Sequence, residues 1–198
     1  MKIKIAAVIS TVFILMSLVS CGKNNNAVDT TTGSNTNEAY TSAEELLSTV
    51  WSSYSDDEKF PAIGGDESNM NEAGPGKYSI EDAEVLDNIL GFPSEEVDRI
   101  DGAASLMHAM NQNTFTCAVF RFKDATDVEN GISALKSNIL ERRWVCGFPD
   151  SLVIAKTPEN YVISVWGIDE GSGTVSLFKQ KLTATIDGVQ IVVDEPIV

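Results

Sequence analysis

The single histidine, His108, is the first side chain to consider for chemistry. One histidine excludes metal sites built from several histidines, and any Ser-His-Asp arrangement would have to use His108. His108 shares one face of a predicted strand with Leu106 and Met110. Because a histidine among apolar neighbours is usually structural, we predict no catalytic or metal-binding role for it, and we expect no cofactor.

Two segments, Ser133–Lys136 and Ser176–Lys179, have the Ser-x-x-Lys spacing in which a lysine activates a serine nucleophile. The companion Lys-Thr-Gly element is missing, because Lys156-Thr157 is followed by proline. A nucleophile elbow and a phosphate-binding loop are also missing from the sequence. We therefore predict no catalytic residues. The alternative is a hydrolase that uses a pair of carboxylates, which cannot be recognised without geometry.

Acidic residues dominate the charge of the chain, with 29 acidic against 14 basic side chains and a formal net charge of −15. They gather in Asp56-Asp57-Glu58, Asp66-Glu67 and Asp169-Glu170. None of these clusters has the spacing of an EF-hand, so we interpret them as solvated or helix-capping groups. So acidic a surface repels nucleic acid and anionic lipid head groups, and we predict no nucleic-acid partner.

The N-terminus predicts an export signal. A lysine-flanked apolar run from Ile5 to Val19 is shorter than the roughly 20 residues that span a bilayer. It ends in Leu18-Val19-Ser20-Cys21, which resembles the lipobox of bacterial lipoproteins. The resemblance implies that residues 1–20 are a signal peptide and that Cys21 carries a diacylglycerol thioether. We expect fatty acyl chains such as palmitate to anchor the protein at the extracytoplasmic face of the cell membrane.

The segment after the lipobox is polar. Asn, Thr, Ser and Gly dominate from Gly22 to Ala39, a composition typical of flexible linkers. We expect residues 21–40 to form the lipidated cysteine and a tether that spans roughly 20–25 Å. Residues 41–198 have enough apolar side chains for one globular domain.

Two capped helices open this domain. The first is predicted over Ala43–Tyr54, where Ser42 and Glu45 form a capping box. The second is capped by Ser79 with Asp82 and ends at a glycine before a proline.

The segment Phe60–Lys77 lies between these two helices. It contains several glycines and no apolar periodicity, which predicts a long loop that is either mobile or functional.

The rest of the domain shows the order strand, strand, helix, twice. The predicted elements are strands Ala103–Met110 and Phe115–Phe122, a helix from Thr126 to Ile139, strands Leu152–Lys156 and Tyr161–Ile168, a helix over Thr174–Leu182 and a last strand over Val189–Val193. The segment Thr174–Ile186 also fits a hairpin strand that would turn at Asp187-Gly188, and this alternative stays open.

These elements predict an α+β fold in two layers. Consecutive hairpins make an antiparallel sheet of about five strands, and amphipathic helices cover one face of it. The strand-strand-helix order is repeated and is preceded by two N-terminal helices. The other face of the sheet would be open to solvent or to a partner.

Cys117 and Cys146 lie in different predicted elements. An extracytoplasmic address permits a disulfide between them, but their sequence separation does not show whether they meet. The sequence favours two buried, unreactive thiols, and pairing stays open.

Several segments together resemble a known group of proteins. The lipobox, the helix Ser42–Trp51, the strand Cys117–Phe122 and the hairpin ending in Tyr161–Gly167 are similar to small lipoproteins of clostridia-like Gram-positive bacteria that carry a domain of unknown function. Such proteins often have an acidic pair where this chain has Phe115-Thr116. The resemblance implies a location and a fold but brings no activity.

We therefore expect a non-catalytic binding or accessory module held at the membrane through Cys21. Its partner would be an envelope protein or peptide, bound on the open sheet face or at the Phe60–Lys77 loop.

Overall fold

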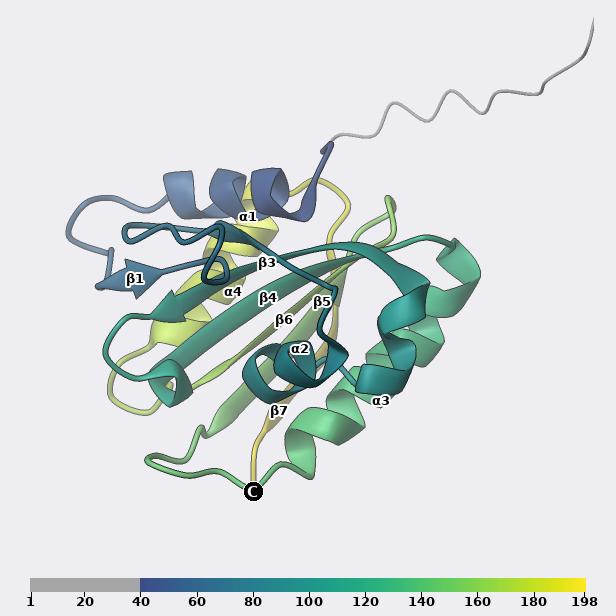
Figure 1. The fold of residues 1–198 in the computed structure, drawn as a ribbon. Helices are drawn as coiled ribbons and strands as arrows, with labels where there is room; N and C mark the ends of the chain where they lie inside the picture. The colour runs from purple at the N-terminus through teal and green to yellow at the C-terminus, as the bar shows by residue number, and fades with distance from the viewer. Residues whose placement is uncertain (1–39) are drawn as a thin grey trace, which may run out of the picture. The chain divides into compact units, whose positions relative to one another are not determined.

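A computed structural model describes residues Tyr40–Val198, all of which belong to one compact unit (Figure 1). The predicted signal peptide, Cys21 and the tether up to Ala39 lie outside the described residues. No helix within Tyr40–Val198 is long and apolar enough to cross a membrane.

The secondary structure follows the predicted order of elements in most places. The helices are α1 (Ala43–Ser52), α2 (Ala83–Leu90), α3 (Val128–Leu140) and α4 (Thr174–Thr185), and the strands are β1 (Ala62–Ile63), β2 (Gly76–Tyr78), β3 (Ile100–His108), β4 (Phe115–Phe122), β5 (Ser151–Lys156), β6 (Tyr161–Gly167) and β7 (Gln190–Pro196). Short 3-10 helices lie at Ser94–Arg99, Gln112–Thr114 and Ala125–Asp127. Residues Thr174–Thr185 form a helix, so the hairpin alternative for Thr174–Ile186 is wrong.

Helix caps explain where α1 and α2 begin. The hydroxyl of Ser42 accepts a hydrogen bond from the Glu45 amide, as the capping box predicts. For α2 the cap is Asp82, whose carboxylate accepts from the amide of Val85. The prediction that Ser79 caps this helix is wrong, because its hydroxyl accepts from the Glu81 amide within the preceding turn.

All the strands pair antiparallel in one open sheet of seven strands. Its order is β1-β3-β4-β6-β5-β7, and β2 also pairs with β3, next to β1. The predicted antiparallel sheet is confirmed, but the count of about five strands is too low. The additional strands β1 and β2 are two and three residues long and come from the Phe60–Lys77 region, where so short a pairing leaves no periodic pattern.

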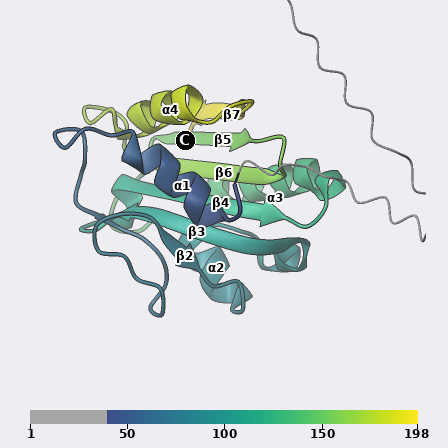
Figure 2. The ribbon, with the colours of Figure 1, turned by 90° about the horizontal axis from the view of Figure 1, so that it is seen from above.

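Helices cover both faces of this sheet, so the domain has three layers (Figures 1 and 2). Cys117 and Val119 of β4 belong to the core under α1 and α4, whereas Ala118 and Phe120 belong to the core under α2 and α3. The prediction of two layers with helices on one face is therefore wrong. Because a sheet covered on both sides buries nearly every position, its strands are mostly apolar rather than alternating, as β4 is apart from Thr116 and Arg121.

The two strand-strand-helix units place their helices differently. Helix α3 packs with the core on one face of the sheet, and α4 packs with the core on the other. Strands β4 and β6, which belong to different units, pair at the centre of the sheet. The repeat in the sequence is therefore a repeat of element order only.

The two described cysteines are both free. Cys117 is buried in β4, as predicted, and burial raises the pKa of its thiol well above the usual value. Cys146 is exposed, which corrects the interpretation of both as buried thiols. It lies in the loop between α3 and β5 and adopts a positive φ of 65°.

Candidate functional site

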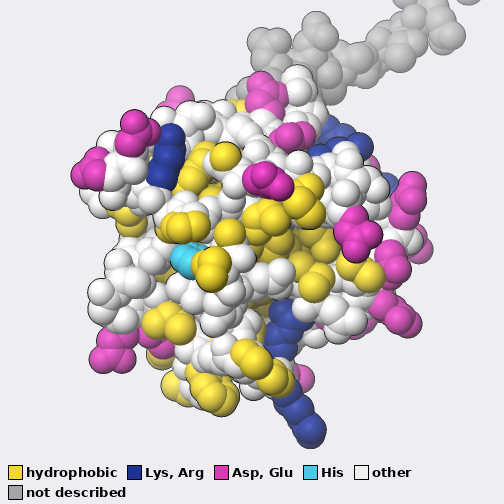
Figure 3. All heavy atoms as spheres, turned by 60° about the vertical axis from the view of Figure 1, so that its left-hand side comes forward, with side chains coloured by type: hydrophobic (Ala, Val, Ile, Leu, Met, Phe, Trp, Pro, Cys, Tyr) yellow, Lys and Arg dark blue, Asp and Glu magenta, His cyan; other side chains and the backbone are white. Residues whose placement is uncertain are grey.

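A groove of about 900 Å³ opens beside the β3 edge of the sheet. Residues from β2 and β3 line it, together with the 63–70 segment on one side and α2 on the other. Hydrophobic side chains gather in the middle of the face that carries the histidine (Figure 3).

Apolar side chains form part of the groove surface, beside polar ones. Ile63, Ile80 and Ile89 are partly buried and pack against the core under α2 and α3, and all three line the groove. Met70 and Val85 also line it and are 53% and 43% exposed. The groove therefore exposes apolar surface that continues directly into the core.

One carboxylate organises the segment that forms the groove wall. Asp66 accepts hydrogen bonds from the amides of Ser68 and Asn69, from the Asn69 side chain and from the amide of Ser79. Burial raises the pKa of Asp66, but these four hydrogen bonds outweigh it and hold the pKa below its usual value. The amide of Gly65 also donates to the buried hydroxyl of Ser105 on β3, at 3.0 Å. The segment is therefore held in one conformation by its own polar groups.

Two glycines let the wall segment lie directly on β2 and β3. A Cβ atom on Gly64 would lie 2.4 Å from both the Gly76 nitrogen and the Ser105 carbonyl oxygen. A Cβ atom on Gly76 would in turn lie 2.7 Å from the Gly64 carbonyl carbon. Only residues without a side chain allow this backbone crossing.

The rim of the groove is acidic. The acidic residues that line it are Asp66, Glu67, Glu81 and Asp101. Among its lining residues, Lys77 is the one that carries a positive charge. Oδ1 of Asp101 lies 2.6 Å from Nε of Arg121, a residue that does not itself line the groove. The acidic rim favours partners that carry basic side chains beside apolar ones.

A smaller pocket of about 160 Å³ adjoins this groove. Ile89 and Gln112 line both hollows, so the pocket and the groove are neighbours. Arg142, Trp144 and Trp166 form much of its wall.

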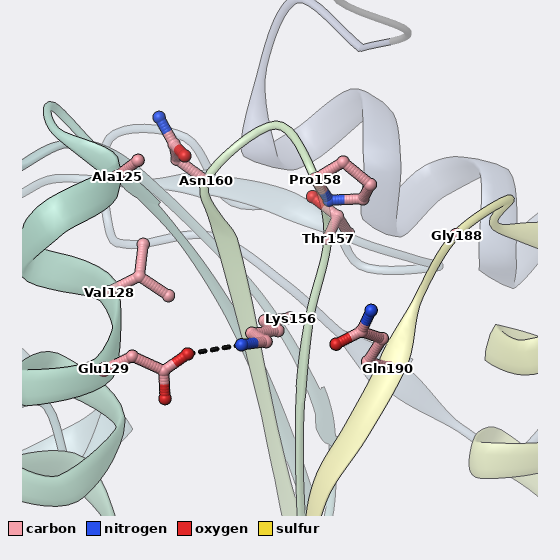
Figure 4. A pocket seen from close by; sticks show the side chains of 9 residues that line it. All are labelled: Ala125, Val128, Glu129, Lys156, Thr157, Pro158, Asn160, Gly188 and Gln190. Carbon is pink, nitrogen blue, oxygen red and sulfur yellow. Dashed lines mark hydrogen bonds and ion pairs between the residues drawn. The ribbon is translucent and has the colours of Figure 1, made fainter.

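A third hollow, of about 280 Å³, lies between α3 and β7, toward the edge of the sheet opposite β1 (Figure 4). Its carboxylate, Glu129, forms an ion pair with Lys156 across the pocket. Thr157, Asn160 and Gln190 supply its other polar side chains. The pocket thus holds one carboxylate that is already neutralised, which does not suit the two-carboxylate mechanism.

Two of the four carboxylates of the large groove, Asp66 and Asp101, are no better placed for hydrolysis. Asp66 accepts hydrogen bonds that fix the wall, and Asp101 is bound to Arg121. A carboxylate that serves as a general acid needs a raised pKa, whereas that of Asp66 is lowered. Within Tyr40–Val198, no group of three or more His, Cys, Asp or Glu side chains could hold a metal ion.

His108 lies at the end of β3 and has structural partners. Its ring stacks on Phe60 with centroids 5.7 Å apart, and its Nδ1 accepts a hydrogen bond from the Met110 amide. These contacts support the interpretation of His108 as a structural residue.

The two Ser-x-x-Lys segments do not form nucleophile-lysine pairs. Ser133 donates to a carbonyl of its own helix, and Ser176 donates to Asp169. Their lysines, Lys136 and Lys179, form ion pairs with Glu195 and Asp194 of β7.

Comparison with known proteins found no family model, no curated protein and no solved structure that matches this chain. The resemblance to small clostridial lipoproteins therefore stays a prediction, and the functional argument rests on the sequence and the groove.

Sequence reasoning pointed to the Phe60–Lys77 region but missed the groove itself. Its residues come from separate segments that no spacing connects: the 63–70 segment, β3 and α2. The available signal in the sequence was Val85, an apolar residue of α2 that lies one turn before Ile89 and lines the groove with it.

Proposed function

We propose that this protein is a lipid-anchored lipoprotein on the extracytoplasmic face of the cell membrane, and that its domain binds a basic, amphipathic segment of an envelope protein or peptide. Two sequence features support the anchor: the lipobox-like Leu18–Cys21 and the polar segment that follows it. The role is that of a binding or accessory module rather than an enzyme.

One observation carries the binding role: the groove beside β3 combines exposed apolar side chains with four carboxylates, and its wall is hydrogen-bonded in place. A preformed site avoids the cost of ordering a loop when the ligand binds. Each aliphatic side chain buried in such a groove contributes about 1.5–3 kcal/mol. Three or four such anchors contribute roughly 4.5–12 kcal/mol before the cost of association, which is about 4–15 kcal/mol, so binding is micromolar at its tightest.

The test compares two matched substitutions in the full chain, purified in mild detergent. Val85→Lys places a charge in the groove, and Val192→Lys places one on β7, at the opposite edge of the sheet. The two valines are similarly exposed, at 43% and 39%.

The probes are short labelled peptides that combine leucine with lysine, or leucine with glutamate, followed by fluorescence anisotropy. The basic peptides should bind the unmodified protein and the Val192→Lys variant equally well. Binding by Val85→Lys should be weaker by about tenfold or more, because one apolar anchor is lost and a like charge is added. Equal binding by all three proteins, or preference for the acidic peptides, would refute the groove as the site.

A further inference from the structure

The pocket that adjoins the groove has a composition unlike the rest of this acidic protein. Arg142 and Arg143 both line it, and the amides of Asn88, Gln112 and Asn113 face the same hollow of about 160 Å³. The volume suits a single small group rather than a whole ligand.

Arg142 is a largely desolvated cation without a carboxylate bound to it. Its guanidinium carbon lies 5.5 Å from the Trp144 ring centroid and 5.8 Å from that of Trp166. The hydrogen bonds of its guanidinium come from Nη2 and end on the carbonyls of Asp87 and Asn88, at the end of α2. Among the described residues no ion pair involves Arg142, and burial lowers its pKa. Nε and Nη1 thus remain available to an acceptor.

Trp144 adds a second donor to this pocket. Its indole Nε1 is buried and has no hydrogen-bond partner within Tyr40–Val198. Buried donors in folded proteins are nearly always paired, so an unpaired donor on a residue that lines a hollow is a candidate partner for an acceptor. The nearby guanidinium indicates that the acceptor is an anion.

Local charge indicates how much negative charge the pocket takes. Arg142 and Arg143 contribute two positive charges, and Asp87, the carboxylate that acts on Arg142, contributes one negative charge, which leaves 2 − 1 = +1. Asp87 itself accepts from the Asn138 and Ser94 side chains. A monoanion such as a carboxylate matches this balance better than a dianion does.

We propose that the segment bound in the groove is the C-terminal end of a polypeptide, and that its terminal carboxylate binds Arg142 and Trp144. The inference rests on the proposed function and specifies the ligand. Because Ile89 and Gln112 line both hollows, a peptide in the groove has its end next to the pocket. The last side chain then lies against Ile89, Val145 and Trp166, which are apolar.

The test compares leucine- and lysine-containing peptides that end in a free carboxylate with the same peptides ending in an amide. The protein is the full chain in mild detergent. The free acids should bind at least about tenfold more tightly, since the amide loses a charge-assisted bidentate contact. The chain has three tryptophans, so the indole N–H resonances can be assigned by substitution, and that of Trp144 should shift most on binding the free acid.

Two variants separate the carboxylate contact from folding. Trp144→Phe keeps an aromatic ring but removes the donor, and Arg143→Gln removes an exposed charge; both should reduce the preference for the free acid. Lys59→Gln, a loss of charge away from the pocket, should leave that preference unchanged. Arg142 itself also binds the end of α2, so its substitution is a weaker test.

The outcomes are distinguishable. Equal binding of acids and amides overturns the carboxylate site while leaving the groove intact. Binding of isocaproate or inorganic phosphate at the Trp144 resonance, without any preference among peptides, overturns the C-terminal ligand in favour of a small anion. Failure of every peptide to bind refutes the proposed function itself.

Discussion

Gly64 and Gly76 contact each other beneath the groove wall. We therefore expect the Gly64→Ala substitution to lower the stability of the domain more than most additions of a single methyl group do. The new Cβ would lie 2.4 Å from two backbone atoms, the Gly76 nitrogen and the Ser105 oxygen. Ordinary contacts begin near 3.4 Å, so one of the backbones has to move by about 1 Å. Overpacking of this kind costs about 1–3 kcal/mol.

The matched control is Gly102→Ala, in β3 at the lining of the same groove. A Cβ there meets only the Arg121 Cβ, at 3.9 Å, and the residue does not have a positive φ. Removing glycine from a strand gains about 0.5–1 kcal/mol. The two alanine variants should therefore differ by roughly 2–4 kcal/mol in their free energy of unfolding.

Urea unfolding and thermal unfolding of the full chain measure this difference. At about 2–4 °C per kcal/mol for a chain of this size, Gly64→Ala should lower Tm by roughly 2–12 °C, while Gly102→Ala should hold or raise it. If Gly64→Ala is as stable as Gly102→Ala, the wall segment does not pack on β2 and β3 as described, and the groove loses its rigid side.

Further predictions concern the anchor, the pH dependence and the thiols. Cys21→Ser should move the protein from the membrane fraction to the soluble fraction, and retention of the variant in washed membranes would contradict a lipid anchor on Cys21. The hydrogen bond from Lys181, followed by those from Ser55, lowers the pKa of Glu58 from 4.5 to about 2. Its stabilising contribution is therefore present above pH 4.5 and is lost as the pH falls toward 2, so Glu58→Gln should show a smaller acid-induced loss of Tm than the unmodified chain does. In the folded protein a maleimide should label Cys146 quickly and Cys117 only on unfolding, because one thiol is exposed and the other is buried with a raised pKa; equal rates would contradict the placement of β4.

Local patterns in the sequence predicted the elements well where they were long and regular. The bounds of β4 match the prediction, and β5 and β6 differ from it by one residue each. Helix α4 was ambiguous because alternating apolar residues at its end imitate a strand, and packing of Val175, Phe178 and Leu182 into the core selects the helix.

It was harder to predict which faces of the sheet are covered, because the spacing of apolar residues indicates which residues are buried but not which elements cover them. Every residue of β6 is buried, so its sequence contains no period-two signal that would distinguish one covered face from two. The groove was missed for a related reason: a turn fixed by Asp66 brings the 63–70 segment against β3, and side-chain hydrogen bonds of this kind leave no periodic trace.

Backbone amide resonances, followed while a leucine- and lysine-containing peptide is titrated into the protein, locate the bound peptide directly. The largest shifts should lie in α2, the 63–70 segment and β3 from Asp101 to Met107, with little change along β7. Shifts concentrated on β7, or at the Glu129–Lys156 pocket, would contradict the groove as the binding site.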